Sequence, residues 1–216
     1  MEERPKILIL GIGNLLWADE GFGVRAVEAM HRAFVFPEHV TLMDGGTQGI
    51  YLIEHVRRAD VLVVLDAIDY GLAPATLKLI EQDDVPKFLG AKKMSLHQTG
   101  FQEVLAMAEM LGDLPGHLFL IGVQPVELDD YGGSLRAEVK AQIAPAIEHA
   151  LAYLARFGVV PERRPALLPD TATLSSPEFA LDLYEGGRPP ASEACRIGDP
   201  RVLAAGADTP TATEDA

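Results

Sequence analysis

Cysteine is almost absent from this sequence. The chain of 216 residues contains one, Cys195. A single cysteine excludes an internal disulfide framework and any cysteine-rich zinc site. It fits a reducing compartment, where disulfides are rarely used for stability.

Positive charge is also scarce. Lysine and arginine number 18 against 32 aspartate and glutamate residues, which gives a formal net charge of −14. An acidic surface repels phosphate backbones and anionic lipid headgroups. We therefore expect no nucleic-acid partner and no membrane partner.

Long hydrophobic runs are missing as well. The apolar run Ile7–Leu10 ends at Gly11, far short of the ~20 residues that a membrane helix needs. No positively charged stretch leads into an apolar core with a small-residue cleavage site, so no export signal is expected. The sequence therefore predicts a cytoplasmic protein.

What the sequence does contain is an alternation of apolar runs and helical patterns. Runs typical of buried strands lie at Lys6–Gly11, Val40–Met43, Val61–Leu65 and Leu118–Val123, and Thr76–Ile80 indicates an additional edge strand. Helical spacing follows at Phe22–Phe34, Ile50–Val56, Phe101–Leu111 and Val139–Phe157. This order predicts an α/β fold, a three-layer sandwich whose mostly parallel, twisted sheet has about five strands and helices on both faces.

The composition changes after Gly158. Eight of the 15 prolines lie beyond that residue, and the final stretch GADTPTATEDA is small and polar. Proline lacks a backbone donor and prevents a helix from continuing. We therefore divide the chain into an α/β domain, residues 1–157, and a proline-rich tail, residues 158–216, expected to be extended or disordered and in part docked.

A glycine-rich turn follows the first predicted strand. Gly11 and Gly13 would allow the backbone to approach a ligand closely. A dinucleotide fingerprint would need a third glycine where Leu16 stands, and Asp19 and Glu20 would repel a pyrophosphate. A nucleotide-binding domain of the Rossmann type is thus one hypothesis, which these acids disfavour.

Three chemically active residues follow different predicted strands. Glu20, Asp66 and His97, the last in a loop predicted over Gly90–Gly100, should lie at one edge of the sheet. Each has a local alternative, since acids favour helix starts and turns and a histidine can bond to backbone. Together, two carboxylates and an imidazole suit a divalent transition metal and leave positions open for a partner. Asp44 opens the next turn and faces the same edge, either as an Asx turn or with a functional role.

Four motifs in order also resemble a known family. They are GIGNLLWADEGFGVRAVEAM, DGGTQG, LDAID and SLHQTG, and the resemblance runs from the N-terminus to Phe157. The chain resembles the endopeptidases that mature nickel–iron hydrogenases. The resemblance implies a twisted sheet flanked by helices and a single cleavage, which removes the C-terminal extension of the hydrogenase large-subunit precursor after nickel insertion.

The resemblance also implies roles for individual residues. Glu20, Asp66 and His97 fall on the metal-binding positions of the family, and the nickel is expected to belong to the precursor. Asp44, in the DGG motif, falls near the site and could accept a proton during cleavage. No HExxH or GxSxG motif suggests another protease class. A non-catalytic nickel-sensing or nickel-carrier protein that docks on the same precursor is the alternative function.

Overall fold

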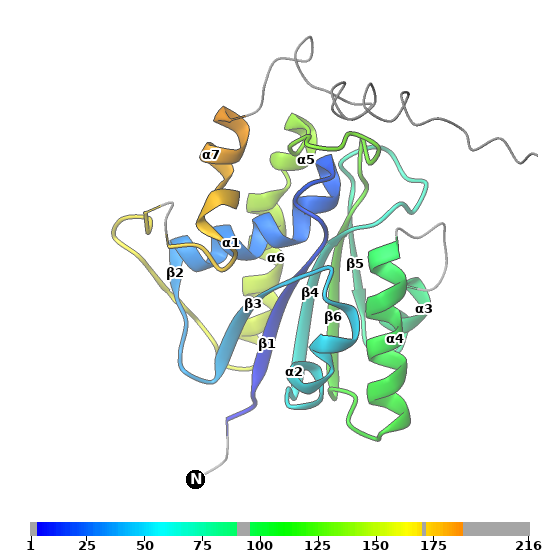
Figure 1. Cartoon of the computed structure of the whole chain (residues 1–216). Coiled ribbons are helices and arrows are strands. Elements are labelled where there is room, and N and C mark those ends of the chain that lie inside the picture. The colour runs from blue at the N-terminus through cyan, green and yellow to red at the C-terminus, as the bar shows by residue number, and fades with distance from the viewer. Residues whose placement is uncertain (1–3, 90–95, 170–171, 188–216) are drawn as a thin grey trace, which may run out of the picture.

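Five strands form the central sheet of the computed structural model, which describes residues 4–89, 96–169 and 172–187. Their order is β3-β1-β4-β6-β5 (Figure 1). The bounds are Ile7–Ile12 for β1, Val40–Gly46 for β3, Val61–Ala67 for β4, Leu77–Glu81 for β5 and His117–Val123 for β6. β1 pairs in parallel with β3 and β4, β4 pairs in parallel with β6, and β5 is an antiparallel edge strand. The predicted three-layer α/β fold and its mostly parallel sheet are confirmed.

Helices and short 3-10 turns connect these strands. The α-helices are α1 Phe22–Ala33, α2 Ile53–Arg57, α3 Asp84–Leu89, α4 Leu96–Met110, α5 Ala137–Lys140, α6 Ile143–Ala155 and α7 Leu181–Gly186. The 3-10 helices are η1 Ala18–Gly21, η2 Gly49–Leu52 and η3 Pro177–Phe179, and a second, two-stranded sheet joins β2 Phe34–Val35 to β7 Glu162–Arg163. No helix in the described part of the chain is both long and apolar enough to span a membrane.

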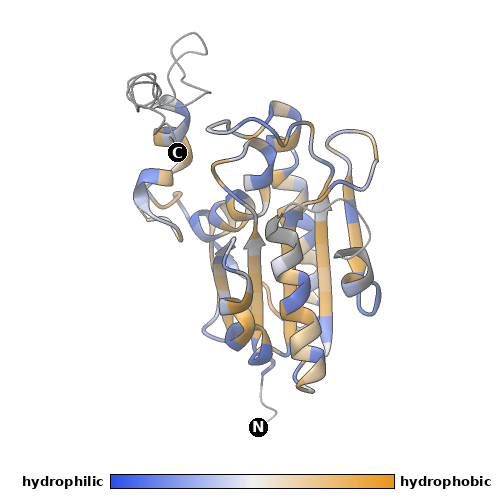
Figure 2. Cartoon of the chain, turned by 45° about the vertical axis from the view of Figure 1, so that its right-hand side comes forward, coloured by the Kyte–Doolittle hydropathy of each residue, from blue (hydrophilic) through white to orange (hydrophobic). Residues whose placement is uncertain are grey.

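The inner strands are mostly apolar because both of their faces are covered. Every residue of β1 and β4 is buried. Along β4 the side chains alternate, so that Val63 and Leu65 enter one hydrophobic cluster and Leu62 and Val64 the other. Figure 2 shows the consequence, apolar strands between helices that carry both apolar and polar residues.

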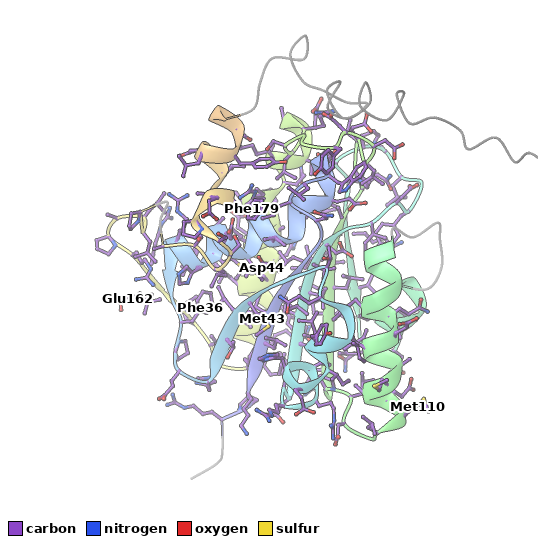
Figure 3. All side chains as sticks on the ribbon, viewed as in Figure 1. Phe36, Met43, Asp44, Met110, Glu162 and Phe179 are labelled. Carbon is purple, nitrogen blue, oxygen red and sulfur yellow. The ribbon has the colours of Figure 1, made fainter. Side chains whose placement is uncertain are left out.

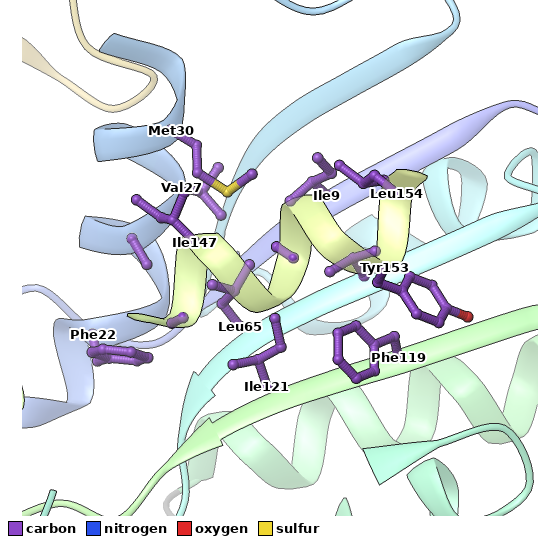
Figure 4. Close-up of a cluster of buried hydrophobic side chains, with 14 of the residues drawn as sticks. Ile9, Phe22, Val27, Met30, Leu65, Phe119, Ile121, Ile147, Tyr153 and Leu154 are labelled. Atoms are coloured by element: carbon purple, nitrogen blue, oxygen red, sulfur yellow. The ribbon is translucent and has the colours of Figure 1, made fainter. Parts of the chain in front are cut away.

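Helices α1 and α6 cover one face of the sheet. Phe22, Val27 and Met30 of α1 meet Ile147 and Leu154 of α6 over the strands (Figure 4). Truncating a fully buried side chain of this size to alanine typically destabilises a protein by about 2–5 kcal/mol. This packing fixes α1 against the sheet, and α1 is the element that follows the glycine-rich turn.

Helices α2 and α4 cover the opposite face. Phe101, Val104 and Leu105 of α4 are buried together with Leu52 of η2 and Val56 of α2. In Figure 1 α4 runs alongside the strands on the side away from α1. The two faces of the sheet therefore have separate cores, and a residue's strand position decides which helix layer it meets.

The chain reverses its direction of travel across the sheet at β1. From β1 it passes through α1 to β3 on one side, and from β3 it passes through α2 to β4 on the other side. Ligands of open α/β sheets bind at the carboxyl ends of the strands on either side of such a switch point. In this protein those strands are β1 and β4.

Several element boundaries differ from the sequence-based predictions. The loop predicted over Gly90–Gly100 ends early, because α4 already begins at Leu96. The single helix predicted over Val139–Phe157 is two helices, α5 and α6, which meet at a turn at Ala141–Gln142. The strand predicted at Val40–Met43 continues to Gly46 and so includes Asp44.

The segment after Gly158 lies along α1 as far as it is described. β7 pairs antiparallel with β2, and the backbone N–H of Leu168 donates to the carbonyl of Arg32 at 3.1 Å. Further on, the segment forms η3 and α7, which an entirely extended tail would not contain. The domain division at Gly158 stays a prediction, and residues 188–216 lie outside the described part.

Candidate active site at the carboxyl edge of the sheet

The turn after β1 brings Glu20 close to the end of its own strand. Gly13 has a φ of +135°, and a Cβ atom there would lie 1.8 Å from the carbonyl oxygen of Glu20. Only glycine combines this backbone conformation with so close an approach. Gly13 therefore allows η1 to lie close to the end of β1.

Helix η1 also reaches β4, across the switch point. Contacts join η1 to β4, and at Gly23 an added Cβ would lie 2.0 Å from the carbonyl oxygen of Leu65. The start of α1 thus rests on the ends of both strands. Because Glu20 belongs to η1 and Asp66 to the end of β4, the fold brings the segments that carry these two carboxylates together.

Asp19 has a structural role at this edge of the sheet. It is fully buried, and its Oδ2 accepts hydrogen bonds from the backbone N–H groups of Val126 (2.8 Å) and Glu127 (2.9 Å). Its Oδ1 accepts from the N–H of Arg136 at 2.7 Å. Asp19 therefore fixes the loop after β6 to the turn after β1.

Glu20 lies in an environment that disfavours its charge. Burial raises the pKa of Glu20 from 4.5 to about 7, and the negative charge of Asp129 contributes further. Asp129 belongs to the loop that Asp19 holds in place. Carboxyl groups in such surroundings are typical of functional sites. Asp129 was not among the site residues predicted from the sequence.

Asp66 lies on the α4 face of the sheet. It is 2% exposed, and it follows Leu62 and Val64, which point into the α4-side cluster, at the same alternate positions of β4. Its Oδ1 accepts a hydrogen bond from the N–H of Ala67 at 2.8 Å. Burial, and then the charge of Asp66, raise the pKa of Tyr70, so Tyr70 is a neighbour of Asp66 that sequence reasoning missed.

The loop that carries Tyr70 is held by the end of β6. The side-chain Oε1 of Gln124 accepts from the N–H groups of Tyr70 (2.8 Å) and Leu72 (3.1 Å), and its Nε2 donates to Asp69 Oδ1 at 2.9 Å. Gln124 is itself buried. This network rigidifies the surroundings of Asp66.

His97 lies in the first turn of α4, not in a preceding loop, and its side chain is outside the described part of the structure. One turn further on, an added Cβ at Gly100 would lie 3.4 Å from the Cα of Gly49, which follows β3. The start of α4 is therefore at the carboxyl edge of the sheet. Among the side chains that are described, no group of three His, Cys, Asp or Glu residues could hold a metal ion; the set Glu20, Asp66 and His97 stays a prediction.

Asp44 lies at the same edge but on the other face. Asp44 follows Val40 and Leu42, which belong to the α1-side cluster, at alternate positions of β3. β1 lies between β3 and β4, so the two strands that carry Asp44 and Asp66 are about 10 Å apart. Asp44 is thus separated from the Asp66 environment.

The surroundings of Asp44 also favour its protonated form. Burial and then the negative charge of Glu28 raise the pKa of Asp44, and a hydrogen bond from the Gly46 backbone and the positive charge of Arg25 partly offset this. A carboxyl group with a raised pKa accepts a proton more readily near neutral pH than an ordinary aspartate.

Asp44 opens onto a cleft of about 400 Å³. Four parts of the chain line it: the glycine-rich turn Gly13–Leu16, Val24 of α1, the end of β3 with the turn after it (Asp44 and Gly46–Gln48), and part of the C-terminal segment, Leu174–Ser176 with Phe179. Figure 3 labels Asp44 and Phe179, which come from these separate parts of the chain. Such a volume lies within the range of about 300–1,000 Å³ that is usual for ligand sites.

A buried ion pair on α1 holds the C-terminal segment beside this cleft. Arg25 and Glu28, 4% and 6% exposed, are paired at 3.2 Å. Arg25 Nη1 also donates to the carbonyl of Phe179, and Glu28 Oε1 accepts from the hydroxyl of Ser175. Both side chains stand between the apolar positions of α1, yet the structure buries them where the C-terminal segment docks.

Known proteins resemble this chain along most of its length. A family model described as hydrogenase maturation protease matches residues 24–153. The hydrogenase expression/formation protein HupD of Thiocapsa roseopersicina is 67% identical over 203 residues, which cover 94% of this chain and 92% of that protein. The hydrogenase 2 maturation protease of Escherichia coli K12 is 40% identical over 155 residues, covering 71% of this chain and 93% of that protein.

A solved structure agrees with the fold. The hydrogenase maturating endopeptidase HybD of E. coli superposes with a TM-score of 0.70 at 38% identity, over 74% of this chain and 98% of that chain. The resemblance that four sequence motifs carry is confirmed by these matches. This chain belongs to the hydrogenase maturation protease family.

Proposed function

We propose that this protease removes the C-terminal extension of a nickel–iron hydrogenase large-subunit precursor after nickel has been inserted. The match to the hydrogenase maturation proteases supports the reaction class. Its E. coli relatives are named for hydrogenase maturation, which supports a hydrogenase precursor as the substrate.

The observation that carries the proposal is that the segments with Glu20, Asp66 and His97 all lie at the carboxyl edge of the sheet. Contacts join η1, which contains Glu20, to β4, which contains Asp66, and α4 begins at the same edge with His97 in its first turn. Two carboxylates and an imidazole are donors that suit nickel. We infer that these three residues bind the nickel ion that the precursor carries, so the ion is part of the substrate.

A metal ion supplied by the substrate would make the protease selective for nickel-loaded over nickel-free precursor. Only a precursor that contains nickel gains the contacts with Glu20, Asp66 and His97, so immature chains bind more weakly. Bound at this edge, the ion would supply Lewis acidity toward a carbonyl group.

We assign proton transfer to Asp44 rather than ion binding. Its strand is separated from that of Asp66 by β1, and its side chain is on the α1 face. A precursor segment of about three extended residues spans the ~10 Å between the two strands. Asp44 therefore acts on a part of the bound peptide that is distinct from the nickel site.

Cleavage of a purified precursor tests this function. Incubation with nickel-loaded precursor should lower the precursor mass by that of a short C-terminal peptide, whereas nickel-free precursor should remain intact. His97→Ala should abolish this mass loss without unfolding the protein. His149→Ala, which removes an exposed histidine on α6, is the matched control and should cleave normally.

The same experiment addresses the alternative function. A non-catalytic nickel-sensing or carrier protein would form a stable complex with nickel-loaded precursor and leave its mass unchanged. Asp44→Asn separates the two roles further, because it should bind the precursor like the wild type and cleave it slowly. Normal cleavage by Asp44→Asn would overturn the assignment of proton transfer to this residue.

A further inference from the structure

The C-terminal segment takes part in the cleft that contains Asp44. Leu174, Ser175, Ser176 and Phe179 line this cleft together with the turns after β1 and β3. Leu174 also packs against the α1-side cluster. One wall of the cleft is thus built by residues that lie more than 120 positions after Asp44 in the sequence.

The wall is anchored to the rest of the protein. The buried Arg25–Glu28 pair bonds to the carbonyl of Phe179 and to the hydroxyl of Ser175. The segment therefore supplies hydrogen-bond partners to two charged groups that are buried where it docks. On the far side of the segment, Glu185 accepts a hydrogen bond from the hydroxyl of Ser134 at 2.8 Å and pairs with Lys140 at 3.0 Å.

The segment is not part of the family's common core. The family model ends at residue 153, and 74% of this chain accounts for 98% of the E. coli HybD structure. In contrast, HupD of T. roseopersicina matches 94% of this chain. Relatives therefore differ in whether they have residues that can form this wall.

We propose that Leu174 and Phe179 are specificity-determining residues that contact the precursor peptide bound beside Asp44. This inference rests on the proposed function, because it takes the precursor as the occupant of the cleft. Leu174 and Phe179 are the apolar side chains that the C-terminal segment contributes to the cleft, so the group they would contact is an apolar side chain of an extended precursor peptide. The hydroxyl of Ser175 is engaged by Glu28 and does not set this preference.

The test compares wall residues with a control on the same segment. Leu174→Ala and Phe179→Ala should each weaken precursor binding and raise KM about tenfold, which corresponds to about 1.4 kcal/mol, while kcat stays within about twofold. Leu183→Ala removes an exposed leucine of α7 that does not line the cleft and should leave both constants unchanged. Phe179→Leu, which keeps an apolar side chain, should restore most of the affinity.

Two readouts distinguish failure of this inference from failure of the proposed function. Binding is measured by fluorescence anisotropy with labelled, nickel-loaded precursor, and cleavage by mass spectrometry. If the wild type binds but does not cleave, the proteolytic function fails, yet the affinities of the wall variants still test the inference. If both wall variants bind and cleave like the wild type, Leu174 and Phe179 are not specificity residues. Thermal unfolding of each variant shows whether lost affinity reflects lost structure. Leu174 packs against the core, so Leu174→Ala can destabilise the protein. If it does, the affinity of Phe179→Ala tests the inference.

Discussion

Replacing Glu20 by glutamine should stabilise the folded protein at high pH. The pKa of Glu20 is raised from 4.5 to about 7, first by burial and then by the negative charge of Asp129. Above pH 7 the folded chain therefore carries a charge where its surroundings disfavour it. Glutamine keeps the size of the side chain and removes this charge.

The direction of this stability change follows from the protons that the folded and unfolded states bind. Between pH 4.5 and about 7 the folded protein holds the Glu20 proton that the unfolded chain releases, so the free energy of unfolding falls as pH rises through this window. For a fully buried carboxyl the rise from 4.5 to about 7 would be worth about 3 kcal/mol. Because Glu20 is half-buried and water screens its charge, we expect about 1 kcal/mol.

Unfolding at two pH values measures this effect. With a chelator present, Glu20→Gln should melt about 2–4 °C above the wild type at pH 8, and the difference should shrink toward zero at pH 5. Asp129→Asn should show a smaller gain of the same sign. Glu109→Gln, which changes an exposed glutamate of α4, is the control and should show no gap that depends on pH.

If Glu20→Gln is no more stable than the wild type at pH 8, the environment of Glu20 does not disfavour its charge. The same variant should also bind nickel-loaded precursor more weakly, because an amide is a poorer ligand than a carboxylate. Gain of stability with loss of function is expected where a site retains an unfavourable group.

Two further substitutions test the scaffold of the site. Asp19→Ala removes a fully buried carboxylate that accepts hydrogen bonds from three partly buried N–H groups. It should lower the free energy of unfolding, measured in urea, by about 3 kcal/mol; a loss below about 1 kcal/mol would contradict this role. Gly13→Ala should abolish soluble expression or cooperative unfolding, because its Cβ would overlap the Glu20 carbonyl. The control is Gly186→Ala, whose added Cβ has no atom within 4 Å; it should behave like the wild type. A well-folded Gly13→Ala protein would contradict the prediction, because it would show that the turn can relax.

The sheet was predictable from the sequence because its signal is local. A strand buried on both faces needs a continuous apolar run, and β1, β4 and β6 each have one. Asp66 could be located for the same reason, since it comes directly after such a run. The start of α4 was harder to predict, because no apolar periodicity marks Leu96–Gly100 and the sequence predicted a loop before Phe101.

The environment of the site could not be predicted, because it depends on distant partners. Asp19 is bonded to N–H groups more than 100 positions away, so from the sequence it was indistinguishable from an acid at a helix start. Arg25 and Glu28 stand at polar positions of an amphipathic helix, and only the docking of Ser175 and Phe179 buries them. No local pattern encodes such contacts.

The opposite faces of Asp44 and Asp66 have a consequence for the proposed reaction. A single shared pocket would let any short peptide reach both carboxylates, whereas two sites on either side of β1 require a chain that crosses the edge of the sheet. Only a precursor bound at both places then has its peptide held beside Asp44. If the precursor binds as proposed, its length and path would couple nickel recognition to cleavage. Leu174 and Phe179, which line the cleft on the α1 side, would then guide that path.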